Sequence, residues 1–331
     1  MANTLRIVSG LQLDTTQGAR SSGYASPAFA ATHRHEGTPV ELRRSGSWLI
    51  RRQVPGAPGR QDASGCYPLL VCTDWGGLAA DLEDLEDLVA VTAVTDPLAG
   101  AEVAELRRAF PDHLEPYKVH HVVELDGYST ATVDKHHRRN VALGHRACTV
   151  SIVETPTAGA DEWGALYAEL VRRHAIVGRA DLPAEALRAQ LAVPGAVLFR
   201  ATVGGELAGM LLWMRSGERA YYHLGAHSEV GYRSRSSYAL FDVALRHFQG
   251  SARFALLGSS AGIAAGEADD GLARFKRGWG TVARQAHIGG RVVDAAAYRQ
   301  LAGASAACQS GYFPSYRAPR PPVDGAADRA R

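Results

Sequence analysis

Lysine is rare in this chain, and the positions where it occurs are candidates for chemistry. Of the 36 basic residues only Lys118, Lys135 and Lys276 are lysines, and the others are arginines. A lysine ammonium is a compact point charge on a flexible stem, whereas a guanidinium is planar and binds bidentately. A lysine kept against an arginine bias indicates a position that needs the compact charge, although drift would leave the same three residues.

The segment "RAYYHLGAH" (219–227) places a proton acceptor and a hydrogen-bond donor side by side. A histidine can take a proton near neutral pH, and the hydroxyl of Tyr222 could donate a hydrogen bond. If the segment is a strand, alternation sends Tyr221 and His223 to one face and Tyr222 to the other. His223 is therefore a candidate general base, with a satisfied core histidine as the alternative.

The polar segment "SEVGYRSRS" (228–236), together with the next residue, Ser237, could bind an anion. Arg233, Arg235 and the neighbouring serines have the donors to hold a phosphodiester or a carboxylate through side chains. A tight nest of backbone amides for a pyrophosphate needs glycines that allow close approach, and no Gly-x-Gly is present here. The alternative is a solvated basic loop.

Two histidine pairs resemble metal ligands at first sight. In His120-His121 and His136-His137, adjacent residues do not converge on one point in a strand or a helix, and no carboxylate or cysteine spacing completes a ligand set. The cysteines Cys66, Cys72, Cys148 and Cys308 form no CxxC pair. The sequence predicts no metal site.

Length and composition set the broad class. The 331 residues fit about two domains of ~150 residues. Hydrophobic residues make up 46%, enough for a packed core, and the net charge of +2 shows no global basic field for nucleic acid. Scattered cysteines, the lack of a secretory signal pattern and the lack of an apolar run of ~18 residues predict a soluble, cytoplasmic protein without membrane insertion.

The first half is predicted to be α/β with a mixed sheet. After a flexible N-terminus, residues 1–24, a domain is expected over residues 25–146. Its expected elements are a hairpin at 39–54, a Gly/Pro loop at 55–65, helices at 77–87 and 101–110, strands at 88–94 and 118–125, and a basic helix within 130–146.

The second half is more regular, with a domain expected over residues 147–317 and a disordered tail at 318–331. The predicted order is a strand, two helices, three antiparallel strands, a helix, a strand, a helix and a strand. These are expected at 148–154, 161–174, 183–191, 196–203, 206–215, 219–227, 237–248, 252–258, 269–280 and 281–289. Together the halves predict an α/β (α+β) fold.

Several segments carry a family resemblance. "AYYHLGAH", "SSYALFDVALRHF", the Phe-Lys-x-x-aromatic run at 275–279 and the junction "HHVVELDGYSTATVDKHHRRNVALG" resemble the Fem-like transferases and the related acetyltransferase 6 family. The resemblance covers roughly residues 115–290. It implies two tandem GNAT-like domains with mixed, mostly antiparallel sheets flanked by helices, the first domain degenerate.

The resemblance also implies roles for individual residues in acyl transfer to an amine. The resemblance places Lys276 in the catalytic region, where its ammonium could neutralise the developing oxyanion or a terminal ribose or phosphate of the donor. Tyr222 and His223 are further catalytic candidates. The expected substrate-binding residues are Arg138, Arg233, Arg235, Ser237, Phe275, Arg277 and Trp279. For Lys276, the alternative is a surface lysine lying along Phe275 and Trp279. Deprotonation of the amine by the substrate itself would need no dedicated base.

Three functions remain in competition. The first is transfer of an aminoacyl group from aminoacyl-tRNA, as co-substrate, to the amine of a small molecule or peptidoglycan precursor, with no further cofactor. The second is an N-acyltransferase that uses acyl-CoA, and the third is a non-catalytic tandem-GNAT binding module. The missing Gly-x-Gly disfavours acyl-CoA, whereas the lack of a tRNA-binding coiled-coil insertion disfavours tRNA.

Overall fold

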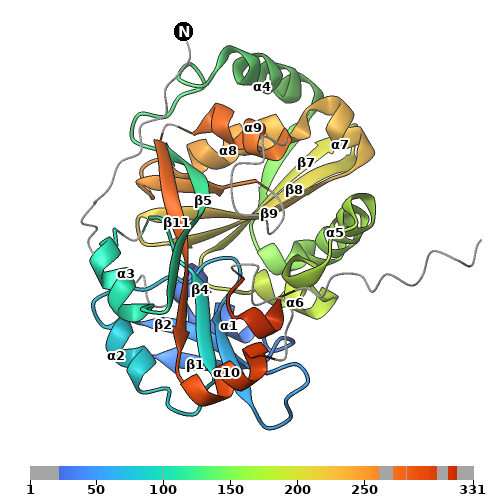
Figure 1. Ribbon diagram of the computed structural model, residues 1–331. Helices are drawn as coiled ribbons and strands as arrows, with labels where there is room; N and C mark the ends of the chain where they lie inside the picture. Colours follow the sequence, from blue (N-terminus) through green and yellow to red (C-terminus); the bar gives the residue numbers. More distant parts are fainter. Residues whose placement is uncertain (1–21, 99, 261–270, 281, 304–311, 319–331) are drawn as a thin grey trace, which may run out of the picture.

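The computed structural model describes residues 22–98, 100–260, 271–280, 282–303 and 312–318, and their strands form one mixed sheet (Figure 1). The strand order across the sheet is β1-β2-β3-β4-β11-β5-β10-β9-β8-β7-β6. Neighbouring strands are antiparallel except in the pairs β3–β4 and β9–β10, which are parallel. The predicted α/β class with mixed, mostly antiparallel strands is confirmed.

The strands are β1 (Thr38–Leu42), β2 (Ser47–Gln53), β3 (Gln61–Gly65), β4 (Ala90–Val94), β5 (His113–Glu124), β6 (Thr149–Val153), β7 (Ala196–Val203), β8 (Glu206–Ser216), β9 (Arg219–His227), β10 (Phe254–Gly258) and β11 (Val282–Val292). The helices are α1 (Pro27–Ala31), α2 (Leu78–Glu83), α3 (Val103–Ala109), α4 (Lys135–Ala147), α5 (Ala160–His174), α6 (Ala184–Gln190), α7 (Glu229–Ser234), α8 (Ser236–Phe248), α9 (Gly271–Trp279) and α10 (Ala295–Gly303). The 3-10 turns are η2 (Gly23–Ala25), η3 (Pro156–Gly159), η4 (Gly178–Ala180) and η6 (Ser315–Arg317).

The two halves of the chain exchange strands at the centre of the sheet. β5 belongs to the first half of the sequence but pairs with β10, and β11 belongs to the second half but pairs with β4. These two long strands also pair with each other, so that they form a continuous ribbon between the halves (Figure 1). Each half therefore depends on a strand from the other. The boundary near residue 146 stays a prediction.

The helices of the second half cover opposite faces of the sheet because side chains alternate along β8. Met210, Leu212 and Met214 pack on one face with α5 and α6. Leu211 and Trp213 pack on the other face with α8, α9 and α4, and this helical layer is visible at the top of Figure 1. The first half has its own core, under α2 and α3.

Several segments differ from the sequence prediction, among them α1 and α10, which were not expected. The end of the expected Gly/Pro loop forms β3, whose polar composition hid the strand. The segment 228–236 contains α7, where the side chain of Ser228 accepts a hydrogen bond from the Gly231 amide as an N-cap. The N-terminus was expected to be flexible as far as residue 24, but η2 is buried; residues 1–21 and 319–331 lie outside the described residues.

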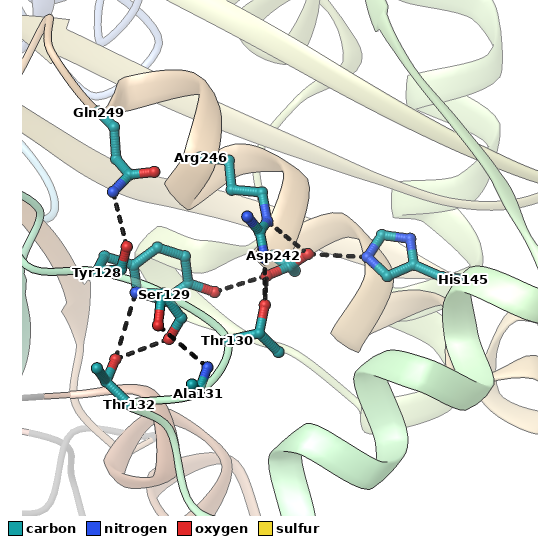
Figure 2. Close-up of polar contacts among 9 residues, drawn as sticks. All are labelled: Tyr128, Ser129, Thr130, Ala131, Thr132, His145, Asp242, Arg246 and Gln249. Atoms are coloured by element: carbon teal, nitrogen blue, oxygen red, sulfur yellow. Dashed lines mark hydrogen bonds and ion pairs between the residues drawn. The ribbon is translucent and has the colours of Figure 1, made fainter.

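A buried carboxylate ties α8 to the segment that leads into α4 (Figure 2). Asp242 of α8 accepts hydrogen bonds from the hydroxyls of Tyr128 (2.8 Å) and Thr130 (2.9 Å). Its other oxygen lies 2.9 Å from Nε2 of His145 and 3.0 Å from Nε of Arg246. Burial raises the pKa of Asp242, but these four partners outweigh it and hold the pKa below its usual value.

None of the helices in the described residues is long and apolar enough to span a bilayer.

Candidate active site

The parallel strands β9 and β10 separate at the centre of the second half. Their pairing begins at Arg219–Phe254 and ends at Tyr221–Leu256. Beyond this point β9 continues along β8 to His227, whereas β10 shifts register and pairs Gly258 with His121 of β5. Gly258 has φ of 80°, a conformation that suits glycine. The residues that follow the last pair are therefore placed around a point where two parallel strands diverge.

Lys276 of α9 spans this point of divergence. Its Nζ donates a 2.8 Å hydrogen bond to the carbonyl oxygen of Ser259, just past the end of β10. The same ammonium lies 5.6 Å from the centre of the Tyr222 ring on β9. Lys276 is only 7% exposed, so it is not the surface lysine of the alternative interpretation. The site holds a buried positive charge between the diverging strands.

Tyr222 and His223 lie on opposite faces of β9, as alternation predicted. Tyr222 packs against Trp213 and Phe241, on the face of Lys276, and burial raises its pKa. His223 lies on the other face, where its Nδ1 is 2.9 Å from the hydroxyl of Tyr24. The structure brings Lys276 and Tyr222 together and leaves His223 apart.

The surroundings of His223 favour a core histidine over the general base, and among the described residues only its Nδ1 has a hydrogen-bond partner. The residue is buried against Tyr24 and Phe29. Burial, with a smaller contribution from His33, lowers its pKa to about 3. An imidazole with so low a pKa is a weak proton acceptor at neutral pH.

Phe275 and Trp279 anchor the helix that carries Lys276. Both rings pack on Phe241 of α8, with centroid distances of 4.9 Å for Phe275 and 5.8 Å for Trp279. Trp279 is 2% exposed. Their positions support α9 and leave little of the Trp279 side chain for a substrate, whereas Arg277 of the same helix is exposed.

The other predicted binding residues lie near the ends of α4, α7 and α8. Arg138 is exposed and donates to the carbonyl of Ala131 at 2.8 Å. Arg233 is also exposed but forms an ion pair with Glu229. Arg235 joins α7 to α8 with φ of 63° and an exposed guanidinium, and Ser237 is half-buried at the start of α8.

The connection between β9 and α8 is closely packed. Ser236 is fully buried, and its hydroxyl lies 2.9 Å from Nδ1 of His227. A Cβ on Gly231 would lie 1.8 Å from the carbonyl oxygen of Ala208, and one on Gly144 of α4 would lie 2.7 Å from that of Arg235. Both glycines therefore serve contacts between elements. A pyrophosphate bound here would need backbone amides that are accessible to it. Because Ser236 is fully buried, its amide is not accessible.

The comparison with known families decides the type of domain. Residues 130–277 match the model of the acetyltransferase (GNAT) domain family. The chain contains a GNAT domain. This match confirms the family resemblance seen in the sequence, and it includes Lys276, Tyr222 and the whole connection between β9 and α8. No curated protein sequence matches the chain.

Solved structures share the fold over most of the chain. The crystal structure of FemX has a TM-score of 0.64 at 13% identity, covering 88% of this chain and 98% of that chain. The C-terminal domain of a putative lysylphosphatidylglycerol synthetase from Agrobacterium fabrum has a TM-score of 0.59 at 13% identity, covering 86% and 93%. L-PGS from Bacillus licheniformis has a TM-score of 0.51 at 14% identity, covering 80% and 92%.

The first half also contains a pair of parallel strands. β3 and β4 pair in parallel at Ala63–Val91 and Ser64–Thr92. The chain then loops out through Cys66 and Leu69, both buried, and Leu70 pairs with Thr95.

Lys118 was singled out in the sequence only because lysine is rare in this chain. Its Nζ donates a 3.1 Å hydrogen bond to the carbonyl of Ser260, next to the carbonyl that Lys276 binds. His120 and His121 follow on β5, and burial, with the nearby cations, lowers their pKa values to about 3 and about 4. Two of the three lysines therefore meet at consecutive carbonyls through strand pairing that the sequence did not show.

Within the part of the chain that the structure describes, no three His, Cys, Asp or Glu side chains are grouped so that they could hold a metal ion.

Proposed function

We propose that the protein transfers an aminoacyl group from aminoacyl-tRNA to the amine of a small-molecule or peptidoglycan-precursor acceptor. The observation that carries the choice of donor is the packed connection between β9 and α8, where Ser236 is fully buried. An acyl-CoA donor would place its pyrophosphate on backbone amides at this connection. A charged tRNA needs no such nest, because it can be held by side chains on the surface.

The reaction needs one bond made and one broken. The acceptor amine attacks the ester carbonyl of the aminoacyl-tRNA, the C–N bond forms, and the bond from the carbonyl carbon to the ribose oxygen breaks. The proton lost by the amine ends on the ribose oxygen, so the substrate itself can serve as the proton acceptor. The buried ammonium of Lys276 supplies positive charge where the oxyanion develops.

A local basic surface supports the tRNA donor despite the small net charge. Residues 134–147 carry four Lys or Arg and one Asp, a net charge of 4 − 1 = +3. We call the exposed side chains of Lys135, Arg138, Arg139, Arg146, Arg235 and Arg277 the basic face. Cations on one face of a protein are the electrostatic requirement for binding phosphates. Because aminoacyl-tRNA is found where translation occurs, the proposal places the reaction in the cytoplasm.

The test is donor competence. The purified protein is incubated with a mixture of radiolabelled aminoacyl-tRNAs and a small-molecule extract, and products are treated with mild base, which cleaves the tRNA ester but leaves an amide intact. We expect a base-stable labelled product that disappears when the tRNA is first digested with ribonuclease. Turnover with an acyl-CoA in the absence of RNA would overturn the proposal in favour of the CoA-dependent transferase. Failure to turn over either donor would favour the binding module.

A further inference from the structure

The imidazole of His137 links α4 to the backbone of the helix that carries Lys276. Its Nε2 lies 2.8 Å from the carbonyl oxygen of Phe275, and this carbonyl belongs to the peptide group that joins Phe275 to Lys276. A carbonyl oxygen only accepts hydrogen bonds, so Nε2 carries the proton. His137 is 3% exposed, so this hydrogen bond is shielded from water.

Asp134 lies on the opposite side of the ring and fixes the backbone from which the ring projects. Nδ1 of His137 lies 3.2 Å from the Asp134 carboxylate. The same carboxylate accepts a 2.7 Å hydrogen bond from the backbone amide of His137 and thereby caps α4. Asp134 thus holds the backbone at the start of α4, and from this backbone the imidazole reaches the Phe275–Lys276 peptide.

Aromatic packing prevents the imidazole from turning away. The ring centroid lies 5.1 Å from that of Tyr238, 5.5 Å from that of Phe275 and 5.1 Å from that of Trp279. α9 also approaches the ring closely at Gly278, where a Cβ would lie 2.0 Å from Cε1 of His137. The glycine is required by this contact and not by its backbone angle.

We infer that His137 is a positioning residue that fixes the ammonium of Lys276 between β9 and β10, with Asp134 capping the helix from which the imidazole projects. The inference rests on the proposed function, in which Lys276 stabilises the oxyanion. The buried Lys276 must reach the carbonyl of Ser259 at 2.8 Å, and its main chain is held from the α4 side through His137. A displacement of about 1 Å at a reacting centre can lower a rate ~100-fold.

The test compares two substitutions at one position. His137→Phe keeps an aromatic ring but loses the donor to the Phe275 carbonyl, whereas His137→Gln places an amide N–H near the former position of Nε2. We expect His137→Phe to lower kcat by about ten- to a hundredfold, with KM for the donor nearly unchanged. His137→Gln should recover most of this loss. His136→Phe, at the exposed neighbouring position, is the matched control and should behave as wild type.

A double-mutant comparison separates positioning from general stability. If His137 acts through Lys276, the variant with both His137→Phe and Lys276→Met should be no slower than Lys276→Met alone. A further multiplicative loss would overturn the inference, as would a wild-type kcat for His137→Phe. If His137→Phe does not fold, Gly278→Ala, which forces the ring and α9 apart, must lower kcat in the same way; a wild-type kcat there contradicts the inference.

The two proposals fail in different ways. Lys276→Met with wild-type turnover would refute the role of Lys276 and with it the basis of this inference. A slow Lys276→Met together with an unaffected His137→Phe would refute the inference alone.

Discussion

The hydroxyl of Tyr221 donates a 2.8 Å hydrogen bond to the carboxylate of Asp96, and thereby joins β9 to the segment that follows β4. Burial raises the pKa of Asp96, and Arg219, the amide of Leu98 and Tyr221 act against that rise. The bond lies in the core where the two halves meet, close to the last residue pair before β9 and β10 separate.

Tyr221→Phe should therefore destabilise the whole chain. The substitution keeps the ring but leaves one oxygen of a buried carboxylate with fewer partners, which costs about 1–3 kcal/mol. The check is the free energy of unfolding from urea titrations at neutral pH. Tyr232→Phe removes a hydroxyl from an exposed ring and should change stability little. Equal stability of the two variants would show that the Tyr221–Asp96 bond contributes nothing net.

Lys276→Met should lose most of the transferase activity while the protein stays folded. The methionine keeps most of the apolar stem on Tyr222 but removes the charge, and loss of one such interaction costs ~3 kcal/mol, about a hundredfold in rate. The measurement is kcat with saturating donor, with circular dichroism to verify the fold. Arg107→Met on α3 removes a cation far from the site and serves as control.

Arg138→Ala and Arg235→Ala should weaken binding of the tRNA donor and make it less sensitive to salt. Each lost phosphate contact reduces the slope of log K against log salt by roughly one. The same substitution at Arg233 should have a smaller effect because that side chain is paired with Glu229. Titrations of tRNA at several KCl concentrations test this. An unchanged slope in both variants would show that these two arginines do not contact phosphates of the tRNA.

The Asp242 network should make stability fall in acid. The pKa of Asp242 is lower in the folded than in the unfolded chain, so the unfolded state binds the proton first. The network's contribution is fully present above the ordinary carboxyl pKa, near ~4, and is lost as pH falls through the lower folded value. Asp242→Asn should cost about 2–4 kcal/mol at pH 6, and the gap to wild type should shrink toward pH 3. A gap that does not depend on pH would contradict this account.

Local patterns in the sequence were sufficient for most of the second half. Alternation placed Tyr222 and His223 on opposite faces of β9, and the apolar spacing of 237–248 predicted α8. The Phe-Lys signature also placed Lys276 on a helix. These features depend on residues that are neighbours along the chain, so the sequence alone determines them. The strand β3 was missed because its residues are polar, and the N-cap of α7 was missed as well.

Only the tertiary structure decided which residues meet. The exchange of β5 and β11 brings Lys118 beside Ser260. The packing of η2 and α1 places the hydroxyl of Tyr24 within hydrogen-bond distance of His223, on the face of β9 opposite Lys276. His137 belongs to a histidine pair that was not expected to bind a metal. It contacts α9 only because α4 folds back onto α8 and α9. These contacts join residues far apart in the sequence, and a strand's pattern records which face it buries but not the strand it will pair with.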